Sequence, residues 1–217
     1  MKNSFKILLA FAIVGMFAFT GCEKSGDKDS TTAGNVTTEE SAGHDHDHDH
    51  DHDHDDEEEA SLSDWEGEWN SIATYADDEK VQGAYKEVAE RDKITEEEAK
   101  QNFAEHVKVE FGAVKIEDGK ITFYDAPNGN EIDSSNFEYV DKHPMEHGGK
   151  TYYWYEFKSD GKFEHVLLMP VHGEETMPHF HLRTGSDVES MLGMDDWYPT
   201  FVSPTVTLDQ VYEEIAE

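Results

Sequence analysis

Three histidines in the C-terminal part of the chain, His172, His179 and His181, have the side-chain type and the spacing of a metal site. Alternate residues of a β-strand point to one face, about 6.5–7 Å apart, so His179 and His181 can converge on one ion. A turn through residues 173–178 would fold His172 back onto this pair. A His-x-His pair alone is weak evidence, because exposed strand histidines are common. With the third imidazole, the pattern predicts a metal site that leaves one tetrahedral position open for water or another donor.

Residues 44–55 alternate histidine with aspartate, and the histidines are His44, His46, His48, His50, His52 and His54. The segment supplies imidazoles and carboxylates without any apolar residue, so it cannot build a core. A solvated acidic linker would account for the aspartates but not for the histidines, and expression tags usually have uninterrupted histidines. We therefore interpret this His-Asp tract as an auxiliary metal-binding segment.

The N-terminus has the pattern of an export signal. Lys2 and Lys6 precede an apolar run over residues 7–19 that is short for a membrane span. The run ends in Phe-Thr-Gly-Cys at residues 19–22, which resembles the signal of bacterial lipoproteins. The resemblance implies that residues 1–21 are a signal peptide and that Cys22 is lipidated. The protein would then be extracytoplasmic and membrane-anchored, in the periplasm or at the cell surface. An ordinary signal peptide with a chance cysteine is the alternative.

Cysteine usage and charge exclude several functions. Cys22 is the only cysteine among 217 residues, so its acylation would leave no thiol for a disulfide or a thiolate metal site. Metal ligands must then be nitrogen and oxygen. The formal charge of −33 disfavours nucleic acid as a partner, because phosphate binding needs basic patches. An acidic surface raises the local concentration of cations, although a salty habitat would favour the same composition.

Residues 22–60 are predicted to be a linker that carries the tract, and residues 61–217 one domain. Helical spacing and capping boxes predict helices over 63–76, 81–89 and 95–107. Beyond residue 109 the period of apolar residues becomes two. This predicts a hairpin over 114–123, strands over 136–141, 151–158, 162–171 and 179–183, and short helices over 186–192 and 207–216. Consecutive strands with short connections predict a mainly β fold, an antiparallel β-barrel with added helices.

Several motifs occur in the order found in the ZinT (YodA) zinc-binding family, and the resemblance covers residues 61–217. The matching segments are Leu-Ser-Asp-Trp-Glu-Gly-Glu-Trp at 62–69, Ile-Glu-Asp-Gly at 116–119, His-Phe-His at 179–181 with Gly185 and Asp187 after it, and Met-Asp-Asp-Trp at 194–197 with a downstream proline. The resemblance implies a calycin-like, lipocalin-related barrel. It also implies an extracytoplasmic protein that binds zinc, or cadmium, at His172, His179 and His181. Such a protein supports zinc uptake through the binding protein of an ABC importer.

The chain departs from the family pattern in three ways. The spacing from His172 to the His179–His181 pair is two residues shorter than the family pattern suggests. The cysteine pair of some members is absent, and many members are soluble rather than lipidated. The first departure makes His172 the ligand that most needs structural support.

Two other functions share the same ligands. A metalloenzyme would use an open three-histidine zinc site to activate water. A hydratase of the carbonic-anhydrase type needs a further downstream histidine, and none follows His181; a cupin oxygenase needs a glutamate where Gly185 and Ser186 stand. We therefore expect no enzyme. A passive sink for zinc or cadmium stays open, as does occupancy by Cu(II), Ni(II) or Co(II).

The domain contains four further histidines outside this predicted site. We expect His143 and His147 in a turn-rich loop around Pro144, where they are candidates for a secondary site. His165 is expected on the sheet face opposite to His172, as a packed or surface side chain. His106 is expected on the exposed face of a helix.

Overall fold

The computed structural model describes residues 59–173 and 177–217. The predicted signal peptide, Cys22 and the six histidines of the His-Asp tract lie outside these residues. Within the described residues, no helix is long and apolar enough to span a membrane.

The helices are α1 (Gln82–Asp92), α2 (Glu96–His106), α3 (Val188–Leu192) and α4 (Leu208–Ala216), with short 3-10 helices η1 (Leu62–Trp65) and η2 (Ile72–Tyr75). The strands are β1 (Gly67–Ser71), β2 (Ala113–Glu117), β3 (Lys120–Tyr124), β4 (Glu131–Asn136), β5 (Glu138–His147), β6 (Lys150–Lys158), β7 (His165–Leu168), β8 (His179–Gly185) and β9 (Thr200–Val202).

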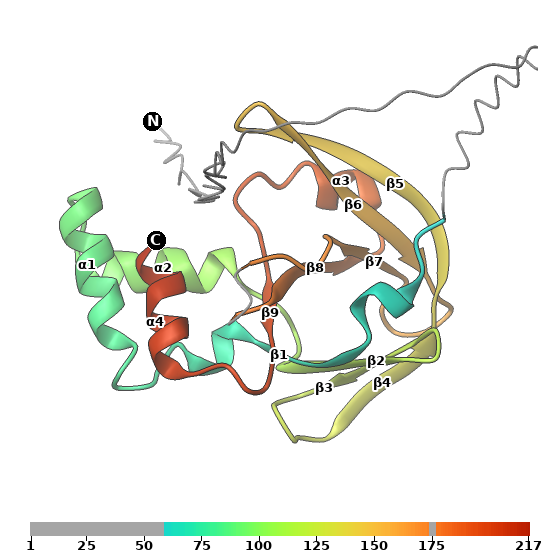
Figure 1. Ribbon diagram of the computed structural model, residues 1–217, viewed down its shortest axis with the longest axis horizontal. Coiled ribbons are helices and arrows are strands. Elements are labelled where there is room, and N and C mark those ends of the chain that lie inside the picture. Colours follow the sequence, from blue (N-terminus) through green and yellow to red (C-terminus); the bar gives the residue numbers. More distant parts are fainter. Residues whose placement is uncertain (1–58, 174–176) are drawn as a thin grey trace, which may run out of the picture. The chain divides into compact units, whose positions relative to one another are not determined.

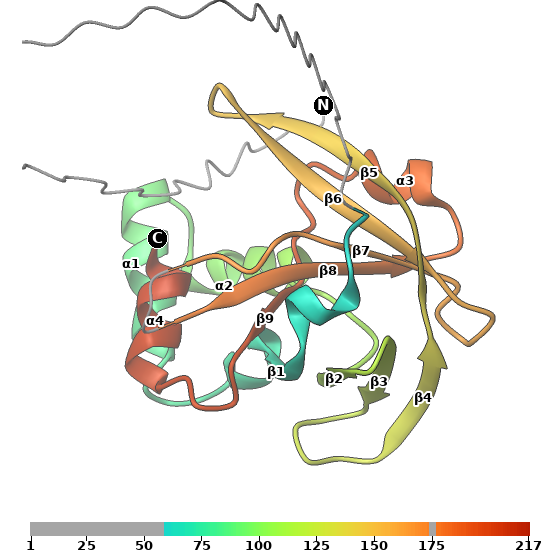
Figure 2. The ribbon, with the colours of Figure 1, turned by 45° about the vertical axis from the view of Figure 1, so that its right-hand side comes forward.

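The strands form one nine-stranded sheet in the order β4-β3-β2-β1-β9-β8-β7-β6-β5. Every neighbouring pair is antiparallel. The two edge strands, β4 and β5, are separated by Phe137 alone. Because they are joined by one residue, the sheet has to curl until its edges meet at this corner, as Figures 1 and 2 show. The described residues show no ladder between β4 and β5, so the predicted barrel is a curled half-barrel. The prediction of a mainly β antiparallel fold is confirmed.

The predicted hairpin over 114–123 is confirmed as β2 and β3. Its two turn residues, Asp118 and Gly119, have φ of 50° and 74°. Positive φ at both positions is what a two-residue turn of type I′ requires, and its twist matches that of the strands. The hairpin therefore starts in a defined register, with Glu117 opposite Lys120.

The helices predicted over 81–89 and 95–107 are confirmed as α1 and α2. Thr95 caps α2 by accepting a hydrogen bond from the backbone of Glu98, whose carboxylate accepts one from the backbone of Thr95 in return. The same reciprocal cap starts α4 at Thr207 and Gln210. These helices pack together beside the sheet (Figure 1), around a second apolar cluster that includes Val81 and Val211.

The prediction of a helix over 63–76 is wrong, because this segment contains β1 between two 3-10 helices. Trp65, Trp69 and Ile72 have helical spacing and are all buried, but each is buried from a different short element. Gly67 has φ of 140°, a conformation that an L side chain rarely adopts and that ends the helical turn. The residues that follow pair with β2 as strand β1, with Trp69 opposite Val114.

The inner face of the curled sheet is filled by large apolar side chains. Their ring centroids lie as close as 4.3 Å, between Phe123 and Phe163. The aromatic members of this core are Trp65, Trp69, Phe111, Phe123, Phe137, Phe157, Phe163, Phe180 and Phe201. Burial of this apolar area is the dominant favourable term in folding. The inside of the half-barrel is a packed core.

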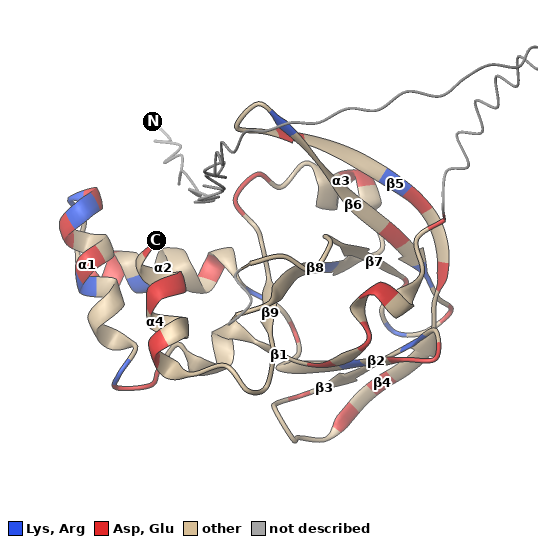
Figure 3. Ribbon diagram, viewed as in Figure 1, with Lys and Arg blue, Asp and Glu red and all other residues tan. Residues whose placement is uncertain are grey.

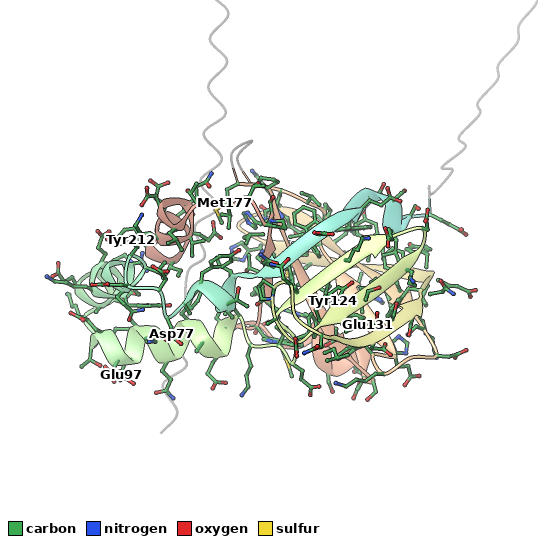
Figure 4. All side chains as sticks on the ribbon, turned by 90° about the horizontal axis from the view of Figure 1, so that it is seen from below. Asp77, Glu97, Tyr124, Glu131, Met177 and Tyr212 are labelled. Carbon is green, nitrogen blue, oxygen red and sulfur yellow. The ribbon has the colours of Figure 1, made fainter. Side chains whose placement is uncertain are left out.

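Strand β8 is buried on both faces. Phe180 and Leu182 belong to the inner core, so the alternating residues His179, His181 and Arg183 point to the outer face. Two apolar clusters cover this outer face. One is formed by α1, α2 and α4 together with Met177, and the other by Trp154 and α3. Figure 4 shows Met177 near the boundary between the helices and the strands.

Candidate metal centre

The structure brings the three predicted histidines together on the outer face of the sheet. One ring nitrogen from each of His172, His179 and His181 lies within 4.8 Å of the other two. Ring centroids are 4.3 Å apart for His172 and His179, 5.1 Å for His172 and His181, and 5.9 Å for His179 and His181. This is the only such group of three histidine or acidic side chains among the described residues.

A backbone bridge explains how His172 reaches the pair. Its N–H donates to the carbonyl of His179 over 2.8 Å, and the N–H of His179 donates back over 2.9 Å. Directly opposite residues of an antiparallel pair share a face, so His172 lies on the face of His179. The short spacing to the pair therefore still brings His172 into the cluster.

Gly173 allows the chain to turn immediately after His172. Its φ is 97°. A Cβ at this position would lie 2.7 Å from Nδ1 of His179 and 2.6 Å from the carbonyl oxygen of Met177. Only glycine combines this backbone conformation with so close an approach to a site side chain.

Backbone carbonyls determine which nitrogen of His172 and His179 carries the proton. Nδ1 of His172 lies 2.8 Å from the carbonyl oxygen of Pro170, and Nδ1 of His179 lies 3.2 Å from that of Met177. A carbonyl oxygen only accepts, so both rings donate from Nδ1. The lone pair of each neutral ring is then on Nε2, ready for a metal ion.

Thr200 determines which ring nitrogen of His181 carries the proton. Its hydroxyl donates to the carbonyl oxygen of Tyr198 over 3.0 Å and lies 3.1 Å from Nδ1 of His181. Because that hydroxyl proton is used, the oxygen accepts from Nδ1 of His181. Nε2 of His181 is buried and has no hydrogen-bond partner among the described residues. An orphaned buried nitrogen with its lone pair facing two other imidazoles is a feature of a metal site.

All three rings are held in the neutral form that a metal ligand needs. Burial lowers the pKa of His172 to about 4, with a further contribution from His179. Burial also holds the pKa of His181 well below its usual value, followed by the effects of His172 and His179. Burial lowers the pKa of His179 in the same direction. A metal ion entering at neutral pH displaces few protons from these rings.

A carboxylate that was not predicted from the sequence lies beside the cluster. Oε1 of Glu214, on α4, lies 3.8 Å from Nε2 of His179, and burial raises the pKa of this carboxyl. Helix α4 packs through Val211 and Ile215, which turns Glu214 toward the sheet. The sequence alone gives little reason to choose Glu214 as a ligand, because it is one of two consecutive glutamates in a segment with an apolar helical pattern.

The other histidines do not join this cluster. His143 lies on β5 and not in the predicted loop, and its Nε2 is 2.8 Å from Oε2 of buried Glu156. Nδ1 of His165 lies 2.8 Å from Oε1 of the same carboxylate. His106 ends α2 and is partly buried rather than fully exposed as predicted, with its Nδ1 3.0 Å from the carbonyl oxygen of Asp196.

A curled antiparallel sheet with a three-histidine cluster on its outer face has the features of a metal-binding protein. The sequence matches the family described as ZinT (YodA) periplasmic lipocalin-like zinc-recruitment over residues 46–217, and the chain belongs to this family. The resemblance noted in the sequence is thereby confirmed. The family is named for recruiting zinc, which is a binding function and not a catalytic one. Comparison with curated proteins gave no match.

Two solved structures from Streptococcus pneumoniae share the fold. One is Zn(II)-bound AdcA, with 18% identity and a TM-score of 0.57 over 72% of this chain and 35% of AdcA. The other is the Zn(II)-bound ZinT-like domain of AdcA, with 18% identity and a TM-score of 0.55 over 73% of this chain and 91% of that domain. The chain thus matches about a third of AdcA, the part that corresponds to its ZinT-like domain.

Proposed function

We propose that this protein captures Zn(II) outside the cytoplasm at His172, His179 and His181. The observation that carries this proposal is the convergence of three imidazoles whose Nδ1 atoms are already engaged. Neutral imidazoles presenting Nε2 are typical zinc ligands, and a donor at the fourth position completes a tetrahedron. Membership of the zinc-recruitment family and the zinc-bound ZinT-like domain of AdcA support the choice of metal.

Glu214 is the fourth donor in this proposal. Its carboxylate is within 3.8 Å of His179 and is held there by the packing of α4. A mixed set of imidazoles and one carboxylate suits zinc and also accepts Cd(II), Cu(II), Ni(II) and Co(II). A site closed by four protein donors has no position for an activated water molecule, in agreement with a binding protein.

The N-terminal segment supplies the rest of the proposed function. Lipidation of Cys22 would anchor the chain in the membrane. Residues 22–60 would then act as a linker of roughly 35 Å if it behaves as a flexible coil. The six tract histidines would collect zinc ions that pass to the more tightly binding domain 61–217. Figure 3 shows acidic residues on the helices and on the strands, which favours the approach of cations.

Zinc held in this way supports uptake if it is passed on, by our proposal to the binding protein of an ABC importer. A passive sink shares the ligands and differs only in this last step. Mixing the zinc-loaded chain with the zinc-free importer component distinguishes the two, because only a delivery protein transfers zinc faster than it releases zinc to a chelator.

Equilibrium titration with a competing chelator tests the proposed site. In the full chain with each of the six tract histidines changed to Asn, we expect one tightly bound zinc ion. His181→Ala should weaken it by at least about a hundredfold, because it removes a direct ligand. The unchanged tract should add weaker sites without altering the tightest one. Tight binding that survives both His179→Ala and His181→Ala would contradict the assignment.

A further inference from the structure

Arg183 is a buried cation beside the metal centre that the proposed zinc site does not use as a ligand. It follows His181 by two residues on β8 and points to the same outer face. Its exposed fraction is 1%. Burial lowers its pKa to about 10, so the guanidinium stays charged at neutral pH. A charge in such a position is costly unless its donors are satisfied, so its partners indicate its role.

The guanidinium group binds one segment of backbone at three points. Nε donates to the carbonyl of Trp197 over 2.8 Å, Nη1 to that of Met191 over 2.6 Å, and Nη2 to that of Met194 over 2.8 Å. The rings of Trp154 and Tyr198 lie 4.3 and 4.9 Å from Cζ. The planar fork of arginine thus closes the segment from Met191 to Tyr198 onto the sheet.

The end of this segment carries the groups that orient His181. The ring of Tyr198 lies 5.4 Å from that of His181 at 76°. The carbonyl of Tyr198 accepts from the Thr200 hydroxyl, which in turn accepts from Nδ1 of His181. The carbonyl of Pro199 accepts from the backbone of Leu182, between His181 and Arg183. Arg183 and His181 are therefore connected twice, through β8 and through the closed segment.

We propose that Arg183 is a positioning residue of the metal centre, which fixes the orientation and the Nδ1–H tautomer of His181 by holding residues 191–200. This proposal rests on the proposed zinc site. Its prediction is specific to one ligand: loss of Arg183 disturbs His181 through Thr200, while Pro170 and Met177 still hold His172 and His179. Partners that orient a ligand typically contribute 10- to 100-fold to metal affinity.

A double-mutant cycle between Arg183 and Thr200 tests the proposal. The background is the full chain with the six tract histidines changed to Asn. Arg183→Lys keeps the charge and removes the fork, and Thr200→Val removes the acceptor of His181. We expect each single variant to weaken zinc binding by about tenfold or more. The zinc affinity of the double variant should be at most about twofold below that of the single variant with the lower affinity. Two-bond ¹H–¹⁵N spectra of the zinc-free chain should show a mixture of His181 tautomers in both single variants.

Phe123→Leu is the matched control for a purely structural effect. Phe123 is buried in the inner core on the opposite face of the sheet. All variants are compared at a temperature at which circular dichroism shows them folded. Phe123→Leu should lower stability, retain zinc affinity within about twofold and leave the tautomer unchanged. Affinity of Arg183→Lys within twofold of the parent, or losses that multiply in the double variant, would overturn the proposal. Absence of tight zinc binding in the parent chain would instead refute the proposed function.

Discussion

Each histidine of the proposed centre has its Nδ1 engaged by a hydrogen-bond acceptor of the protein. Carbonyl oxygens accept from His172 and His179, and the Thr200 hydroxyl accepts from His181. The rings therefore need no change of tautomer when a metal ion arrives. Preorganisation of this kind raises affinity because little conformational freedom remains to be lost on binding.

The lowered pKa values predict how acid acts on the zinc-free chain. The ordinary pKa of His172 is 6.5, and burial in the fold lowers this pKa to about 4. The unfolded chain binds more protons in this window, so the free energy of unfolding falls as the pH drops from 6.5 to 4. A shift of this size corresponds to about 3 kcal/mol at most. Glu214 acts in the opposite direction, because burial raises its pKa.

The contribution of His172 is measured by urea unfolding at pH 7, 5.5 and 4.5 for the parent chain and His172→Gln. The variant should lose less stability on acidification than the parent. Equal losses would show that His172 is not held neutral by the fold.

Glu214 and Glu213 form a matched pair of carboxylates on α4. Glu214 is half-buried beside His179, whereas Glu213 is exposed. If Glu214 is the fourth donor, Glu214→Gln should weaken zinc binding by about tenfold or more, and Glu213→Gln should leave it within about twofold. Chelator competition with both variants in the same background checks this. Equal affinities would assign the fourth position to another donor.

At the scale of elements, β8 illustrates what could be predicted. The alternation of His179, Phe180 and His181 is visible in the sequence and fixed which face each side chain takes. The position of His172 could not be derived from periodicity, because it depends on a backbone bridge across a turn. The same limit applies to β1, where aromatic spacing suggested a helix, and to α4, whose docking brings Glu214 to the site.

Gly173 and Gly149 allow the role of the turn after His172 to be tested. Both have positive φ, 97° and 77°, so alanine introduces backbone strain at either position. A Cβ on Gly173 would meet His179, whereas a Cβ on Gly149 would meet nothing within 4 Å. Gly173→Ala should weaken zinc binding by about tenfold or more, because it displaces a ligand. Gly149→Ala should destabilise the fold by about 1 kcal/mol and leave zinc affinity unchanged.

This comparison requires thermal unfolding and zinc titration of both glycine variants. If Gly173→Ala binds zinc as tightly as Gly149→Ala, the turn does not set the position of His179.

At the scale of the whole molecule, the two faces of the curled sheet have different roles, one in stability and the other in the proposed function. Its inner face is a packed aromatic core, and its outer face carries the histidines between two apolar clusters. Because both faces of β8 are buried, His179 and His181 lie on a strand that is packed from both sides. The His-Asp tract is proposed to add capacity and speed of capture, while the domain supplies the tight site.

X-ray absorption at the zinc edge, on the full chain loaded with one equivalent of zinc, tests the central claim most directly. We expect a four-coordinate ion with three imidazoles at about 2.0–2.1 Å and one oxygen, even with the tract present. His179→Ala with His181→Ala should change this spectrum to one with more oxygen and less ordered imidazole scattering. An unchanged spectrum in the double variant would place the first zinc ion elsewhere and contradict the proposed three-histidine site.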